Sequence, residues 1–315
     1  MVTTLGVVAV LLLGGCDAVF GLDRDPVADA ADAPIDSSGE DSAPRCAQPA
    51  PDFGLPIGLV GAFSPPQTVI GPISLEVTEG DVMVYAVDDG SMGTHYNVLA
   101  AFARRPTGGE WTHQGYVAFS PQLASAAVWP RLWREDGGQI RMFFETNGQR
   151  RLATPTDAFN GMWGHVEVTQ SAGGLDLPTD HIAGLALGGA RVIVARESDR
   201  TIIELERDVV TGAIGPIVPS TDAINTTGGG SHPSITADGC WLLFDRPEAD
   251  NNELWIAVRG NDGNFEAPRK LLGSSTALDE TWPSLSEDGT TLYYSSWDRA
   301  VVPVNYEKMT YRLRE

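Results

Sequence analysis

The ionisable and aromatic residues that could do chemistry in this sequence form no recognisable catalytic motif. It has no G-x-S-x-G elbow, no H-E-x-x-H pair, and no glycine loop of the phosphate-binding or dinucleotide-binding type. The histidines stand at positions 95, 113, 165, 181 and 232, which is no metal-ligand spacing. The sequence therefore predicts no catalytic residue, no metal site and no cofactor.

A second group of residues could bind a ligand because each member lies at the start of a strand-like segment. These residues are Trp129, Arg131, Asp180, His181, His232, Asp279, Glu280 and Trp282. Aromatic faces that stack and carboxylates that accept hydrogen bonds would suit a sugar or a cationic peptide. The alternative is packing between repeated units, and it is favoured because Trp129, His232 and Trp282 share one position of an internal repeat.

The repeat is clearest in two stretches, "HPSITADGCWLLFD" from His232 and "WPSLSEDGTTLYYS" from Trp282. Each predicts two strands joined at Asp-Gly, because this pair supplies the positive φ that a tight hairpin needs. Weaker copies extend the series backwards, with Ile182 standing where the others have proline. The anchor positions of the five units are 72, 130, 182, 233 and 283.

A spacing of about 50 residues fits one four-stranded antiparallel unit per repeat. The third strands are predicted in "HYNVLAAFAR", "RTIIELER" and "ELWIAVRG", and fourth strands in "WTHQGYVAF" and "FEAPRKLL". Residues 62–70 are similar to that last segment, so 63–70 is expected to be the outer strand missing from the last unit. The sequence predicts an all-β fold, a single β-propeller of five four-stranded blades closed by an N-terminal strand. Two unrelated β-sandwiches are the alternative.

The pattern of Pro-Ser, Asp-Gly and a following "LWIAVR" strand resembles the PD40, or WD40-like, repeat of TolB-like β-propellers. The stretch "AVWPRLWREDGGQIRMFFETN" is also similar to a blade of five-bladed glycosidases, which need three carboxylates on their innermost strands. Where the first carboxylate would stand, this chain has Gly71 and Pro72. That difference weakens the resemblance to the hydrolases, although other carboxylate pairs could serve.

The N-terminus resembles a bacterial lipoprotein signal. An apolar run too short to span a bilayer ends in Leu13, Gly14, Gly15 and Cys16, as in a lipobox, although no Lys or Arg precedes it. The resemblance implies a signal peptide at 1–15, a lipid on Cys16 and a protein of the cell envelope, on its periplasmic face or at the cell surface. The segment "CDAVFGL" is similar to the start of myxobacterial lipoproteins. A plain secretory signal is the alternative.

Residues 16–54 are rich in Asp, Ala, Pro and Ser, which predicts a flexible acidic tether, with the propeller at 55–315. Two cysteines remain after Cys16, and in an oxidising compartment Cys46 and Cys240 could form a disulfide or stay separate. The net charge of −21 argues against nucleic acid as a partner.

These observations favour a lipid-anchored, exported propeller that binds or scaffolds in the cell envelope. Its expected partners are the membrane, through the lipid, and an envelope protein, a peptide or a glycan. A carbohydrate-active propeller enzyme is the alternative function, and Asp279 and Glu280 would be its first residues to test.

Overall fold

In a computed structural model of the chain, every sheet that the described residues form lies in one unit, Ala43–Glu315. The structure describes Cys46 and residues 52–54, 57–58, 68–77, 80–88, 98–107, 109–123, 128–135, 138–146, 149–167, 180–196, 198–209, 213–248, 251–271, 278–287, 289–297 and 308–313. The predicted signal peptide and Cys16 lie outside these residues.

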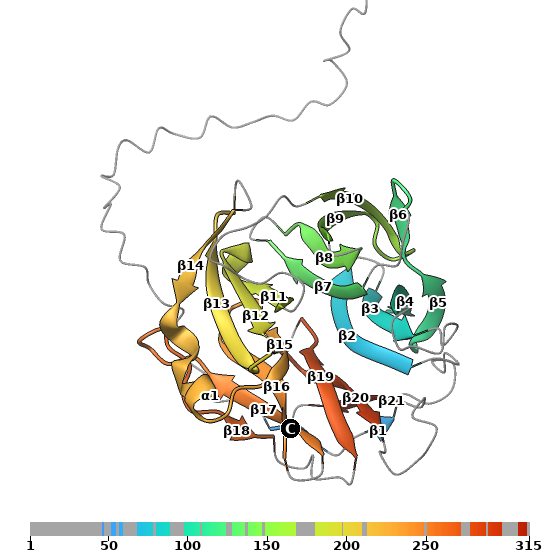
Figure 1. Cartoon of the computed structure of the whole chain (residues 1–315). Helices are drawn as coiled ribbons and strands as arrows, with labels where there is room; N and C mark the ends of the chain where they lie inside the picture. The colour runs from blue at the N-terminus through green and yellow to red at the C-terminus, as the bar shows by residue number, and fades with distance from the viewer. Residues whose placement is uncertain are drawn as a thin grey trace, which may run out of the picture. The chain divides into compact units, whose positions relative to one another are not determined.

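The fold is an all-β propeller, as predicted, with five antiparallel blades around a central axis (Figure 1). The first strand of every blade is its innermost strand, and each contacts the innermost strands on either side, so that the ring closes. The innermost strands are β2 (Thr68–Val77), β7 (Val128–Arg134), β11 (Asp180–Ala186), β15 (Ser231–Ile235) and β19 (Asp279–Leu285).

The middle strands of the blades are apolar over most of their length because they pack against a neighbouring blade on both faces. The second strands are β3 (Gly80–Asp88), β8 (Ile140–Thr146), β12 (Arg191–Arg196), β16 (Trp241–Pro247) and β20 (Thr291–Trp297). The third strands are β4 (Val98–Pro106), β9 (Gln149–Asp157), β13 (Thr201–Arg207), β17 (Asn252–Val258) and β21 (Lys308–Leu313).

The outer strands differ most from the expected scheme. They are β5 (Thr112–Tyr116), β10 (Met162–Glu167), β14 (Ile214–Val218), β18 (Arg269–Lys270) and β1 (Ile57–Gly58). In addition, β6 (Ala118–Ser120) leaves the first blade and pairs in parallel with β10, so four blades have four strands and the second has five. Short helices, η1 (Leu187–Gly189), η2 (Pro219–Thr221) and α1 (Asp222–Thr226), lie between strands.

An N-terminal strand does complete the last blade, but the predicted segment was wrong. The outer strand is β1, which pairs with β21, whereas Thr68–Ile70 belongs to β2 and pairs with β3. The sequence misplaced it because the innermost strand was expected to start at Pro72. In fact β2 continues upstream of the proline, across a register shift between Ile70 and Ile73.

The same irregularity occurs in every innermost strand, at the anchor of each repeat. The shifts fall between Val128 and Arg131 in β7, between Ser231 and Ser234 in β15, and between Thr281 and Ser284 in β19. Proline has no N–H to donate to a ladder, so a bulge on the edge strand of a sheet is where it is tolerated. In β11 the shift lies between Ile182 and Gly184, so Ala183 rather than Ile182 takes the proline position.

One apolar cluster fills each of the five junctions between neighbouring blades. Met142 and Phe144 of the second blade, for example, pack with Val82 and Val84 of the first. The junction between the last blade and the first contains Tyr293 of β20 against Trp111. Because the last junction is filled like the others, hydrophobic packing as well as strand pairing closes the ring.

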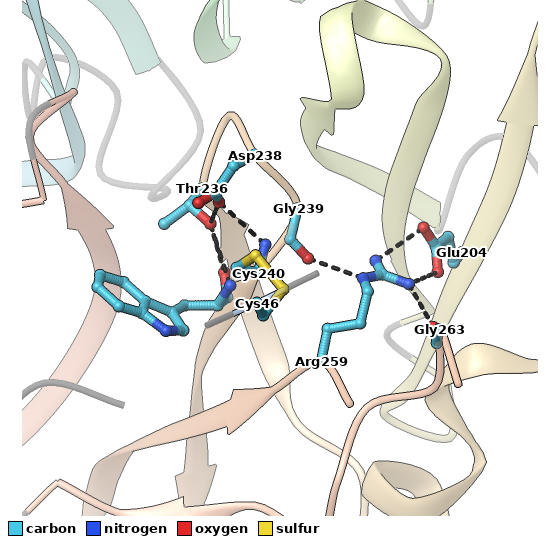
Figure 2. Close-up of a disulfide and its surroundings, with 9 residues drawn as sticks. Cys46, Glu204, Thr236, Asp238, Gly239, Cys240, Arg259 and Gly263 are labelled. Atoms are coloured by element: carbon cyan, nitrogen blue, oxygen red, sulfur yellow. Dashed lines mark hydrogen bonds and ion pairs between the residues drawn. A yellow bond between two sulfur atoms is a disulfide. The ribbon is translucent and has the colours of Figure 1, made fainter. Parts of the chain in front are cut away.

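The N-terminal segment is fastened to the fourth and fifth blades. Cys46 and Cys240 form a disulfide, and Figure 2 shows it beside the hairpin turn of Asp238 and Gly239. Phe53 is buried among Leu243, Leu285 and other apolar residues of those blades. Described residues before position 55 therefore contact the propeller. None of the described helices is long and apolar enough to cross a membrane.

Candidate functional site

The innermost strands place one equivalent residue of each blade around the axis, directly after the bulge. Each of these residues pairs with the same position of the second strand, which is Val84, Phe143, Ile193, Leu243 or Tyr293. The five equivalent residues are Ile73, Arg131, Gly184, Ser234 and Ser284. Four positions thus carry small or apolar side chains, and Arg131 is the exception.

Four of these five residues line a pocket where β7, β11, β15 and β19 meet, which we call the axial pocket. The volume that water can enter is about 70 Å³, which is enough for several water molecules or one ligand group. Its lining combines the hydroxyl-bearing residues Ser234, Thr236 and Ser284 with the apolar residues Trp133 and Leu285. The Thr236 hydroxyl donates to Asp238 in the hairpin turn. All lining residues come from the second halves of the strands or the turns that follow, so the pocket lies towards the hairpin-turn end of the axis.

Arg131 is the buried cation of the axial pocket, with 7% of its surface exposed. Its Nη1 donates to the carbonyl oxygen of Pro130 at 3.0 Å, and its guanidinium carbon lies 5.6 Å from the ring centroid of Trp282. Among the described residues, its buried Nε has no hydrogen-bond partner and no carboxylate pairs with the group. Desolvation lowers the pKa of Arg131 to about 10, so the side chain stays charged at neutral pH.

A second arginine of β7 is neutralised across the axis. The Arg134 guanidinium donates to both carboxylate oxygens of Glu287, which follows β19. The second and fifth blades are not neighbours in the ring, so this ion pair spans the pocket. Arg131 is consequently the one charge of the pocket lining that no described carboxylate offsets.

His232 and Trp282 form a stacked pair on the adjacent part of β15 and β19. Their ring centroids are 3.5 Å apart, and Trp282 is only 8% exposed. Asp245 lies between the two strands, with Oδ1 2.7 Å from His232 Nδ1 and 3.3 Å from the Trp282 backbone nitrogen, which donates to it. The geometry favours packing between blades for this pair, because neither aromatic face of Trp282 is free for a sugar.

Buried carboxylates gather near the start of β19. Asp279 and Glu280 are each 1% exposed, and Asp245 on the neighbouring blade is 2% exposed. Asp279 accepts a hydrogen bond from the Asn252 backbone nitrogen at 2.7 Å, which ties the start of β19 to β17. At least one of these acids therefore has a structural contact between blades.

Of the residues predicted as a ligand face, Arg131 lines the axial pocket, whereas the others that the structure describes lie beside it, in the first halves of their strands. For Trp129, Asp180 and His181 the structure describes the backbone but not the side chains. Sequence reasoning missed Ser234, Ser284 and Asp245. The serines could have been found, because both follow the anchor proline of their repeat as Arg131 does. No group of His, Cys, Asp and Glu among the described residues could hold a metal ion.

No family model matches the chain, and no curated protein matches it in sequence. Among solved structures, the catalytic domain of the Coprinopsis cinerea GH62 alpha-L-arabinofuranosidase is 8% identical and covers 85% of this chain and 98% of its own, with a TM-score of 0.58. Native Bacillus subtilis arabinanase Arb43A is 13% identical and covers 78% of this chain and 93% of its own, with a TM-score of 0.51. A putative TolB from Agrobacterium tumefaciens is 12% identical and covers 78% of each chain, with a TM-score of 0.44. The arabinofuranosidase and the arabinanase, at these low identities, show a shared fold alone, and that fold is the β-propeller.

Proposed function

We propose that this propeller binds a carbohydrate in the axial pocket. The observation that carries the proposal is the convergence of hydroxyl and guanidinium donors from separate blades on one pocket that also has apolar walls. A few placed polar groups against apolar surface are typical of small-ligand sites. The arabinofuranosidase and arabinanase that share the fold are, by name, carbohydrate-active proteins, which further supports a sugar as the ligand.

The test is binding of the purified full-length chain to a panel of neutral and acidic oligosaccharides, followed by calorimetry on those that bind. Substituting Ser234→Ala and Ser284→Ala together should weaken binding about tenfold or more, because each hydroxyl contributes roughly 1 kcal/mol to a ligand hydrogen bond. Thr112→Ala, at an exposed position of β5, is the matched control and should bind like the parent. Binding that is unaffected by the double substitution would place the sugar elsewhere, and no binding at all would refute the proposal.

Hydrolysis of the bound glycan is the second candidate function, and the buried carboxylates of β19 are the observation that favours it. Glycosidases commonly use a pair of carboxyl groups, one of them kept protonated by burial. If the chain is a hydrolase, Glu280→Gln should abolish release of reducing ends while sugar binding persists. Binding without any product from the parent chain would leave a binding protein.

We also propose the cell envelope as the site of action, with Cys16 carrying the lipid and the membrane as a partner. A lipid on Cys16 would be the anchor, so Cys16→Ser should release the protein from the membrane fraction. Membrane association of that variant would contradict the proposal. The scaffold function remains a prediction that co-purification with an envelope protein would support.

A further inference from the structure

Arg131 departs from the repeat at the position directly after the bulge, which lines the axial pocket in four of the blades. The equivalent residues that line the pocket are Gly184, Ser234 and Ser284, which are small. In a repeat fold, a long charged side chain at such a position is not needed to complete a blade. The arginine therefore calls for an explanation beyond the architecture.

Burying this guanidinium without a carboxylate is unfavourable for folding. An unpaired buried charge costs several kcal/mol in a protein interior, even after local relaxation. Among the described residues, the compensation consists of one backbone carbonyl, from Pro130, and the nearby ring of Trp282. A guanidinium has five N–H donors. The N–H groups of Arg131 that have no acceptor in the protein are therefore available to a ligand in the pocket.

The charge of the pocket sets the charge of the group that fits it. Its lining contains Arg131, Arg134 and Glu287, and the last two neutralise each other. The balance is one positive charge in a chain whose net charge is −21. A single carboxylate matches this balance, whereas a phosphate carries nearly two charges at neutral pH. The acidic chain would repel a long polyanion, which restricts the ligand to a short one.

We propose that Arg131 binds the carboxylate of a short acidic sugar, a uronate, in the axial pocket. A planar carboxylate can accept two parallel N–H bonds from the guanidinium fork. The Ser234 and Ser284 hydroxyls, on the fourth and fifth blades, are placed to bond the sugar ring or the second carboxylate oxygen. This inference rests on the proposed carbohydrate site and names its substrate class.

The experiment compares each uronate with its neutral counterpart on the intact chain by calorimetry, using galacturonate against galactose and glucuronate against glucose. Inorganic phosphate is a third arm. We expect at least one uronate to bind tenfold or more tightly than its neutral counterpart, with phosphate weaker than that uronate. Arg131→Gln should remove this preference, so that the uronate and its neutral counterpart bind equally.

The matched control is Arg104→Gln, which removes an arginine outside the axial pocket, where its guanidinium donates to Asn160. It should retain the preference for the uronate. If Arg131→Gln does not fold, Arg131→Lys should keep the charge, lose the bidentate fork and reduce the preference several-fold.

Equal affinity for uronate and neutral sugar, or tighter binding of phosphate, would overturn the inference while carbohydrate binding stands. A preference that survives in Arg131→Gln would also overturn it. Failure of every sugar in the panel would instead remove the proposed function itself.

Discussion

His232 and Trp282 show how single residues keep an unusual backbone conformation. Both have positive φ, 48° and 58°, which is rare for side chains with a Cβ, and each precedes a proline. Such strain persists only where the surroundings hold it. Here the rings stack on each other, and the Asp245 carboxylate fixes both residues. The carboxylate, buried on a second strand, therefore determines the geometry of two innermost strands.

The titration of another histidine, His113, should make the free energy of unfolding depend on pH. Burial lowers the pKa of His113 and raises that of Tyr85, so at neutral pH an uncharged His113 shares a hydrogen bond with the Tyr85 hydroxyl through Nδ1. Between the lowered folded pKa and the unfolded value of about 6.5, the unfolded chain binds more protons. The contribution of His113 is thus fully present above about pH 6.5 and is lost as the pH falls through that window.

Urea unfolding of the parent and of His113→Gln at several pH values from 5 to 8 measures this contribution. The parent should lose free energy of unfolding more steeply than the variant as the pH falls. Thr112→Ala, one residue away on β5, should follow the parent. Identical slopes for the parent and His113→Gln would show that His113 does not titrate in this way.

At the scale of the element, the sequence predicts what the repeat encodes and little else. Hairpin turns follow from Asp-Gly, and Gly239 and Gly289 indeed have φ of 73° and 68°. The anchor prolines predict the positions of the innermost strands, because proline is tolerated at the bulge of such a strand. The outer strands were harder, because β1 and β18 have only two residues each and carry no periodic pattern. Asp245 was missed because its partners, His232 and Trp282, lie on other strands and are far from it in the sequence.

A buried ion pair connects the third and fourth blades. Arg259, directly after β17, donates to both carboxylate oxygens of Glu204 in β13 and to the carbonyl oxygens of Gly239 and Gly263, as Figure 2 shows. Glu204 is fully buried and Arg259 is 4% exposed. Removing one partner leaves an uncompensated buried charge, whereas replacing both leaves none.

Glu204→Leu should therefore lower the free energy of unfolding by about 3–5 kcal/mol. The double variant Glu204→Leu with Arg259→Met should recover much of that loss, which a double-mutant cycle by chemical denaturation measures. The single variant Arg105→Gln disrupts the half-exposed pair with Asp81 and is the control, with an expected change of about 1 kcal/mol or less. Additive losses in the double variant would contradict this account of the junction.

For the whole molecule, stability depends on how a ring of five similar blades is closed. Four junctions join consecutive blades, but the fifth joins the first blade to the last, across the whole sequence. The N-terminus contributes to closure from within the last blade, where its described strand pairing covers Ile57 and Gly58. Phe53 and the disulfide from Cys46 to Cys240 attach the same N-terminal segment to the fourth and fifth blades, so the described residues of 46–58 act together as a closing segment.

Two shortened chains separate this closing segment from the residues before it. A chain starting at residue 43 retains the entire compact unit and should melt within about 2 °C of the parent, since only residues outside that unit are lost. A chain starting at residue 59 lacks the disulfide, Phe53 and β1, and it exposes the edge of β21. The disulfide alone should account for about 2–4 kcal/mol, and the free edge should promote aggregation.

Calorimetry and size-exclusion chromatography measure both effects, and the full-length double variant Cys46→Ser with Cys240→Ser isolates the share of the disulfide. If the chain starting at residue 59 stays monomeric and melts like the parent, the blades close the ring through their apolar junctions alone and the N-terminal strand is dispensable.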